Sequence, residues 1–221
     1  PSLGLHLNII EPEKTLHDVL NRNARLREAV YPSGGFDVIP ASIFKEMEVN
    51  PLKLKDHLNS IKKRYDVIVL DSSPSLDDET LAVILASDEI FVVTTPDHPT
   101  MSASLKAARL AKQRGTPISG IILNKVHNRD FELSLEDIED TLDIPVLAVI
   151  PYDINVLKAL SNMEPSTTFK PNSQGSEEFM KFAATITGEK YETKGFMNFF
   201  RAIVPTKPEI NREIFYSNVF G

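Results

Sequence analysis

The sequence contains no cysteine, carries no excess of positive charge and has no long apolar run. Without cysteine, its 221 residues form neither a disulfide framework nor a thiolate metal site, which is compatible with a reducing compartment. No run approaches the roughly 18 apolar residues typical of a membrane span, and we expect no secretory signal peptide. The net charge of −7 argues against a broad nucleic-acid-binding surface, although a local basic patch remains compatible.

The composition is that of a globular protein. Apolar residues make up 42% of the chain, enough for a sizeable core in one large domain or two small ones. The sequence opens at Pro1 without a methionine and continues directly into the apolar stretch Leu3–Ile10. We therefore expect it to begin partway through a longer protein.

The stretch Arg64–Leu76 contains the strongest signal for a ligand site in the sequence. Its apolar, largely β-branched part, Tyr65–Leu70, predicts a strand buried on both faces, as in a parallel sheet. Asp71 follows the strand at the sheet edge where open α/β sheets bind ligands. In nucleotide-hydrolysing folds an acid at this place orients Mg²⁺ and its water shell. Alternatively, Asp71 only caps the next turn or helix.

Predicted strands alternate with predicted helices, which indicates βαβ units with right-handed crossovers and a parallel sheet. The expected strands are 36–40, 65–70, 89–95, 118–126 and 145–150. The expected helices are 15–21, 26–30, 51–64, a helix capped by Asp77 or Asp78, 99–114, 134–142, 155–161 and one that ends at Gly188. Residues 162–173 are expected to form a loop.

Polar groups follow four of these strands. They are Asp71, Thr94–Asp97, Asn124–Lys125 and Pro151–Asp153. In a parallel sheet these strand ends would line one ligand-binding edge. Each has an ordinary alternative role, since Asn124 could bridge loops and Asp153 could cap the next helix.

Several segments, in order, resemble the MinD/ParA family of deviant P-loop ATPases, and MinD-like proteins most closely. They are Leu3–Leu7, Thr15–Leu20, Gly35–Ala41, Tyr65–Asp71, Ala86–Thr94, Gly120–Val126 and Ile150–Asp153. The resemblance covers roughly residues 3–188. It implies an α/β three-layer sandwich, with a mostly parallel sheet and helices on both faces, that is incomplete at its N-terminus.

The resemblance also implies roles for individual residues, with ATP or ADP and Mg²⁺ as cofactors. Asp71 would be the catalytic, metal-linked carboxylate, acting on Mg²⁺ through water. Asn124 would hydrogen-bond the adenine ring, whose edge matches an amide that both donates and accepts. The loop beside the base would comprise Pro151, Tyr152 and Asp153, with Val156 packing on it.

Two further segments acquire roles by the same resemblance. Ser72–Leu76 would move with the nucleotide state, and Thr95–Ser102 would lie near the face of an ATP-dependent homodimer. Ser72–Ser75 departs from MinD relatives, which usually carry a glycine shortly after this proline, and is closer to ParA.

The family's phosphate-binding loop is absent, because no G-x-x-x-x-G-K-[S/T] motif occurs in the sequence. The second-strand Asp-x-Asp motif is also absent. In this family both precede the segment that matches Leu3, so we expect them upstream of Pro1. Without a phosphate cradle, the sequence as it stands should bind ATP poorly and hydrolyse it negligibly.

Residues 194–204 predict an interfacial amphipathic helix that resembles the membrane-targeting helix of MinD proteins. Its apolar face consists of Phe196, Phe199, Phe200 and Ile203. The alternative is an ordinary surface helix docked on its own domain. One such helix would bind a membrane weakly, so dimerisation would be needed to double the contact. Residues 205–221 could dock to the body or to a partner.

These expectations divide the chain into a partial ATPase domain, 1–190, and a C-terminal tail, 191–221. The predicted function is a cytoplasmic, peripherally membrane-associated ATPase switch that positions cell-division, motility or surface machinery. It would dimerise with ATP, respond to a regulatory protein of unknown identity and not bind nucleic acid. The alternatives are a non-hydrolysing scaffold or adaptor and a ParA-type DNA-partitioning ATPase.

Overall fold

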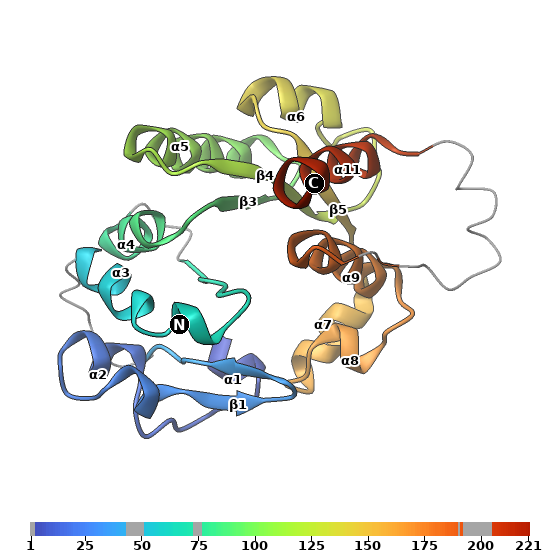
Figure 1. Ribbon diagram of the computed structural model, residues 1–221. Helices are drawn as coiled ribbons and strands as arrows, with labels where there is room; N and C mark the ends of the chain where they lie inside the picture. Colours follow the sequence, from blue (N-terminus) through green and yellow to red (C-terminus); the bar gives the residue numbers. More distant parts are fainter. Residues whose placement is uncertain (1–2, 43–50, 73–76, 190, 192–204) are drawn as a thin grey trace. The chain divides into compact units, whose positions relative to one another are not determined.

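The computed structural model describes residues 3–42, 51–72, 77–189, 191 and 205–221. The chain divides into two compact units, which are described separately (Figure 1). Unit 1 contains Pro1–Ser87 and Ala159–Pro165, and unit 2 contains Asp88–Lys158 and Ser166–Gly221. Within the described ranges, no helix is both long and apolar enough to cross a membrane.

Unit 1 consists of short helices and one hairpin. Its elements are α1 (Leu3–His6), α2 (Leu16–Leu20), η1 (Leu26–Ala29), β1 (Tyr31–Ser33), β2 (Phe36–Val38), α3 (Pro51–Asn59), η2 (Lys62–Arg64) and α4 (Asp78–Ala86). As predicted, Thr15 caps α2: its hydroxyl accepts from the Asp18 N–H at 3.4 Å, and in return the Thr15 N–H donates to the Asp18 carboxylate at 3.0 Å. Asp77 caps α4 by accepting from the Thr80 N–H at 3.0 Å.

The prediction of a buried strand at Tyr65–Leu70 is wrong for this structure. No strand is assigned to this segment, and Val69 is 78% exposed. Ile68 and Leu70 are half-buried and pack beside the small cores of unit 1. A β-branched run becomes a strand only where a neighbour supplies ladder hydrogen bonds, and no described segment pairs with this one.

Unit 2 contains a parallel three-stranded sheet in the order β3-β4-β5, as the alternating pattern predicts. The strands are β3 (Ile90–Thr94), β4 (Ile118–Val126) and β5 (Val146–Pro151). The helices are α5 (His98–Arg114), α6 (Leu135–Leu142), α7 (Ile154–Ser161, whose last residues belong to unit 1), α8 (Ser166–Phe169), α9 (Gln174–Thr187) and α11 (Lys207–Phe220). The short helix α8 interrupts the stretch predicted to be a loop.

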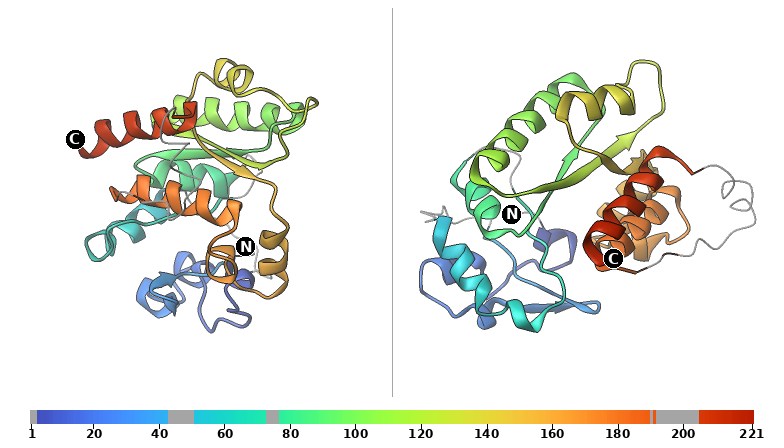
Figure 2. Two further views of the ribbon diagram at one scale, coloured as in Figure 1. Left: turned by 90° about the vertical axis from the view of Figure 1, so that its right-hand side faces the viewer. Right: turned by 45° about the horizontal axis from the view of Figure 1, so that its top comes forward.

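Helices cover both faces of this sheet (Figure 2). On one face, residues of α5 and α6 form a core with the fully buried Ile121 and Leu123 of β4. On the other face, Phe91 of β3 makes edge-to-face ring contacts with Phe182 of α9 and Phe215 of α11. Unit 2 is therefore an α/β arrangement of three layers.

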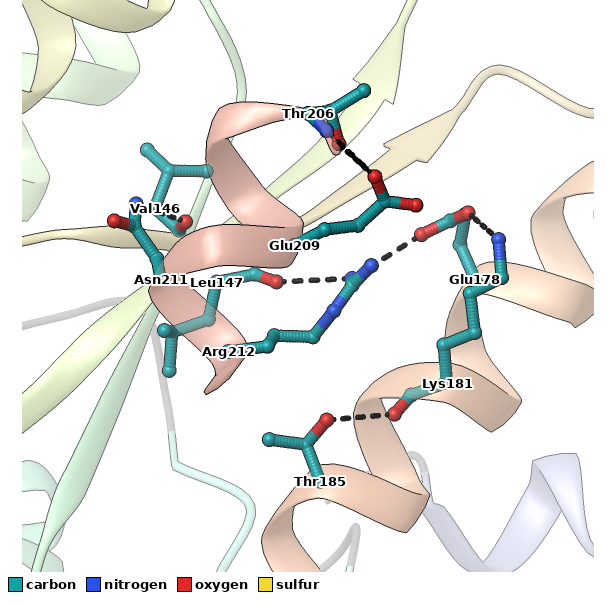
Figure 3. A network of polar contacts seen from close by, with 9 residues as sticks. All are labelled: Val146, Leu147, Glu178, Lys181, Thr185, Thr206, Glu209, Asn211 and Arg212. Carbon is teal, nitrogen blue, oxygen red and sulfur yellow. Dashed lines mark hydrogen bonds and ion pairs between the residues drawn. The ribbon is translucent and has the colours of Figure 1, made fainter. Parts of the chain in front are cut away.

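Helix α11 packs on the sheet and α9 of unit 2, so residues 207–220 dock to the body as one of the two expected alternatives (Figure 3). Arg212 donates to the carbonyl oxygen of Leu147 at 3.1 Å and lies 3.4 Å from the Glu178 carboxylate of α9. Asn211 donates to the carbonyl oxygen of Val146 at 2.9 Å. These bonds satisfy carbonyl groups of β5.

A second set of contacts holds the start of α11. Glu139 of α6 lies 2.5 Å from the Lys207 ammonium and accepts from the Asn211 side chain at 2.8 Å and the Val146 N–H at 2.7 Å. Burial raises the pKa of Glu139, but these donors outweigh it and leave that pKa below its ordinary value. The predicted membrane helix, with Phe196, Phe199, Phe200 and Ile203, lies outside the described residues.

Candidate functional site

The carboxyl ends of β3, β4 and β5 lie at one edge of the sheet of unit 2. The register pairs Thr94 with Leu123 and Val126 with Pro151, and the Tyr152 N–H donates to the Val126 carbonyl oxygen at 2.9 Å. Three of the four predicted strand ends therefore meet. Asp71 is an exposed residue of unit 1, so its place beside Asn124 stays a prediction.

Asn124 occupies an irregularity in β4. The ladder register shifts between Leu123 and Val126, and Lys125 adopts a positive φ of 56°. The Lys125 N–H donates to the Asn124 side-chain oxygen at 2.9 Å, a local bond that suits this bulged conformation. Asn124 is half-exposed at the ligand edge of the sheet.

An aromatic pair adjoins this edge. The rings of His127 and Tyr152 are stacked with centroids 4.6 Å apart, and Tyr152 is 46% exposed. The His127 N–H donates to the Glu132 carboxylate at 2.9 Å, as does the Arg129 N–H at 3.1 Å. Burial raises the pKa of Glu132, but these backbone donors outweigh it and lower that pKa. The loop after β4 is thereby held against the loop after β5.

The carboxylate of Asp153 joins two helices. It accepts from the Asn155 N–H of α7 at 2.8 Å and from the Gly175 N–H of α9 at 3.2 Å. Burial raises the pKa of Asp153, but the Ser173 hydroxyl and these N–H groups outweigh it and lower that pKa. Pro151 and Val156, both half-buried, flank the same loop.

Thr95–Ser102, the segment expected near a dimer face, begins α5. Asp97 caps the helix by accepting from the Thr100 N–H at 2.9 Å and also accepts from the Thr95 hydroxyl. The Thr95 hydroxyl and then the Thr100 N–H hold the pKa of Asp97 below its ordinary value. The Leu133 N–H donates to the Pro96 carbonyl oxygen at 3.0 Å, which fixes this turn to the loop before α6.

The residues at this edge fit the base of a nucleotide better than its phosphates. A half-exposed amide beside an aromatic loop suits the polar edge of a purine. This sequence contains no Gly-Lys loop that could bind the phosphates of a nucleotide. Within the described ranges no three acidic, histidine or cysteine side chains gather into a metal cluster. Asp71 could still hold Mg²⁺ through water, since Mg²⁺ keeps much of its hydration shell.

Sequence reasoning missed His127 and Gly175. The stacking of His127 on Tyr152 depends on the pairing of β4 with β5, which no local pattern encodes. The sequence Ser173-x-x-Ser176 could have indicated the cap of α9, where the Ser176 N–H donates to the Ser173 hydroxyl at 3.4 Å. Nothing in the sequence near Gly175 points to Asp153.

Comparisons with known proteins agree with this architecture. A family model described as an AAA domain matches residues 2–110, and a second model with the same description matches residues 76–159. The chain belongs to the MinD/ParA family of P-loop ATPases.

Three relatives illustrate this membership. An uncharacterised ATP-binding protein of Methanocaldococcus jannaschii is 35% identical over 81% of this chain and 69% of its own length. The cell division ATPase MinD of Pyrococcus furiosus is 30% identical, with a TM-score of 0.76 over 84% of this chain and 80% of its own. The septum site-determining protein MinD of Pyrococcus horikoshii, complexed with Mg-ADP, is 29% identical, with a TM-score of 0.76 over 84% and 78% of the two chains.

Proposed function

We propose that the protein is a MinD-like switch that binds ATP between two subunits and acts at a membrane surface. The observation that carries this proposal is the meeting of Asn124 with the Pro151–Asp153 loop at the carboxyl edge of a parallel sheet. Such an edge is where open α/β sheets bind nucleotides. Relatives named as MinD and as ATP-binding proteins support it.

In this proposal each group has a defined task. Asn124 hydrogen-bonds the adenine edge, and the Pro151–Asp153 loop with Val156 encloses the base. Asp71 orients a hydrated Mg²⁺ ion, which neutralises phosphate charge when bound. The phosphate-binding loop would be supplied by a segment upstream of Pro1, so ATP hydrolysis would belong to the complete polypeptide.

Substitution of Asn124 tests the base site. In the complete polypeptide, Asn124→Ala should weaken ATP binding about tenfold, because hydrogen bonds worth about 1–2 kcal/mol are lost. Titration of a fluorescent ATP analogue measures this affinity. Asn59→Ala, at the exposed end of α3, is the matched control and should bind as the wild type does. Equal affinity of Asn124→Ala and the wild type would exclude the adenine-binding role.

Sedimentation with anionic liposomes tests the membrane role of residues 194–204. ATP should increase binding of the complete polypeptide, because a dimer presents two amphipathic segments. The double change Phe199→Asp and Phe200→Asp should abolish binding, whereas Phe131→Asp, at a 76% exposed phenylalanine, should not. Retained binding of the double variant would refute the membrane assignment.

A second candidate is a non-hydrolysing scaffold that keeps this fold. The two candidates differ in whether the complete polypeptide carries a G-x-x-x-x-G-K-[S/T] motif, which these 221 residues do not contain. A Gly-Lys loop in the coding sequence upstream of Pro1, together with ATP turnover by the complete polypeptide, would decide for the switch. A ParA-type DNA partitioner would instead show salt-sensitive DNA binding with ATP.

A further inference from the structure

The loop after β5 is bound on two sides. On one side, the Tyr152 N–H donates to the Val126 carbonyl oxygen of β4 at 2.9 Å. On the other, the Asp153 carboxylate accepts the Gly175 N–H in the first turn of α9, 22 residues further along the chain. The loop therefore connects the sheet to a helix that follows much later in the sequence.

The contact between Asp153 and α9 is tight at position 175. A β-carbon at this position would lie 3.2 Å from both the β-carbon and the carboxylate Oδ2 of Asp153. It would also lie 3.4 Å from a methyl group of Val156. Any larger residue would therefore press on the loop that carries Tyr152 and on the first turn of α7.

The carboxylate is occupied by the chain's own donors. One oxygen accepts from both the Asn155 N–H and the Asn155 side-chain amide at 2.8 Å, and the other accepts from Gly175. The first N–H groups of a helix have no partner within the helix, so a carboxylate that binds two helix starts stabilises both. Asp153 therefore acts on its own backbone, where a ligand-binding role would have required oxygens directed at the base.

We propose that Asp153 and Gly175 are positioning residues that hold the Pro151–Asp153 loop against α9 and so set the affinity of the site for the nucleotide base. The inference rests on the proposed function, because it assigns the base to the edge formed by Asn124 and this loop. It adds α9, which contributes no residue to the site as predicted from the sequence.

The test compares a ligand that carries a base with one that does not. In the complete polypeptide, Asp153→Ala should weaken ATP binding about tenfold, by the loss of roughly one charge-assisted hydrogen bond. Binding of inorganic tripolyphosphate, measured by displacement of a fluorescent ATP analogue, should stay within about twofold. Equal weakening of both ligands would indicate general loss of structure and overturn the inference.

Gly175→Ala approaches the same contact from the other helix. It should also weaken ATP binding and spare tripolyphosphate. The double variant should lose less than the product of the two single effects, because both changes act on one contact. Asp137→Ala is the control, since that carboxylate accepts from the Ser134 hydroxyl at 2.6 Å at the start of α6. It should leave both affinities unchanged.

Failure of the inference and failure of the proposed function are distinguishable. If the wild type binds neither ATP nor the fluorescent analogue, the proposed function falls and the inference falls with it. If the wild type binds ATP and Asp153→Ala binds it equally well, only the inference is overturned. Strictly multiplicative effects of Asp153→Ala and Gly175→Ala would also overturn it, because they would show that the two residues act independently.

Discussion

Two apolar, β-branched segments of this chain adopt different structures. Ile118–Val126 forms β4 between two parallel neighbours, and its Ile121 is fully buried. Tyr65–Leu70 has a similar composition, yet it forms no strand and leaves Val69 78% exposed. The difference shows that β-propensity describes a surface suited to a sheet, whereas the strand itself depends on what lies beside it.

The largest expected effect tests this contrast directly. In the 221-residue chain, Leu123→Ala in β4 should lower the free energy of unfolding by about 2–5 kcal/mol, because it leaves a cavity in the core of unit 2. Val69→Ala should change it by less than about 0.5 kcal/mol, since little surface is buried there. Urea unfolding followed by circular dichroism measures both.

Similar losses for the two variants would contradict the contrast between the segments. The same two variants in a longer polypeptide would test the contrast further. If a preceding strand pairs with Tyr65–Leu70 there, Val69→Ala should lower the free energy of unfolding substantially, whereas Leu123→Ala should lower it as before.

A smaller loss of stability is expected when the contacts of α11 with β5 are removed. Arg212→Ala should lower the free energy of unfolding by about 2 kcal/mol, because it leaves the Leu147 carbonyl without its charged donor and leaves Glu178 paired with Lys181 alone. Lys112→Ala is the control, since Lys112 forms an exposed ion pair with Asp143 at 3.6 Å and should matter little. Urea unfolding of the two variants compares them. A loss in Arg212→Ala no larger than that in Lys112→Ala would show that Arg212 does not stabilise the packing of α11 on this strand.

The smallest effect concerns the pH dependence of the same docking. Glu139→Gln should cost about 1 kcal/mol at pH 7, because it removes a carboxylate that accepts from Lys207, Asn211 and Val146. Because the pKa of Glu139 is lowered in the folded state, its contribution is present above the ordinary value of 4.5 and is lost as pH falls through the folded pKa.

The difference between wild type and Glu139→Gln should therefore shrink in urea unfolding at successively lower pH. Glu213→Gln changes an exposed glutamate on α11 and should show no such trend. A difference that stays constant down to the acid limit would mean that the charge of Glu139 contributes nothing to the docking.

Local signals predicted several helix bounds closely, although α1 and α11 were not predicted as helices. Ser134 caps α6, Gly115 ends α5 in the left-handed conformation at φ 75°, and β4 has the predicted bounds. A cap or a glycine stop acts within a few residues, so the sequence around it determines the outcome. The hairpin strand β1 and the short helix α8 were missed, since three or four residues give too short a pattern.

Non-local contacts limited how much of the candidate site could be predicted from the sequence. The topology placed Asn124 beside the Pro151–Asp153 loop, because parallel strands end at the same edge of a sheet. The bond between Asp153 and Gly175 and the docking of Arg212 join residues far apart in the chain with no shared pattern. That no described segment pairs with Tyr65–Leu70 was equally beyond local reasoning.

The docking of α11 gives the segment before it two attachment points. Glu189 and Thr206 both belong to unit 2, and the ring of Phe220 near the far end of α11 lies close to Gly188. In the proposed membrane-bound state, a lipid contact between those points would hold unit 2 through two covalent links. Such a double tether would restrict how unit 2 swivels over a bilayer, which a single trailing anchor would not do.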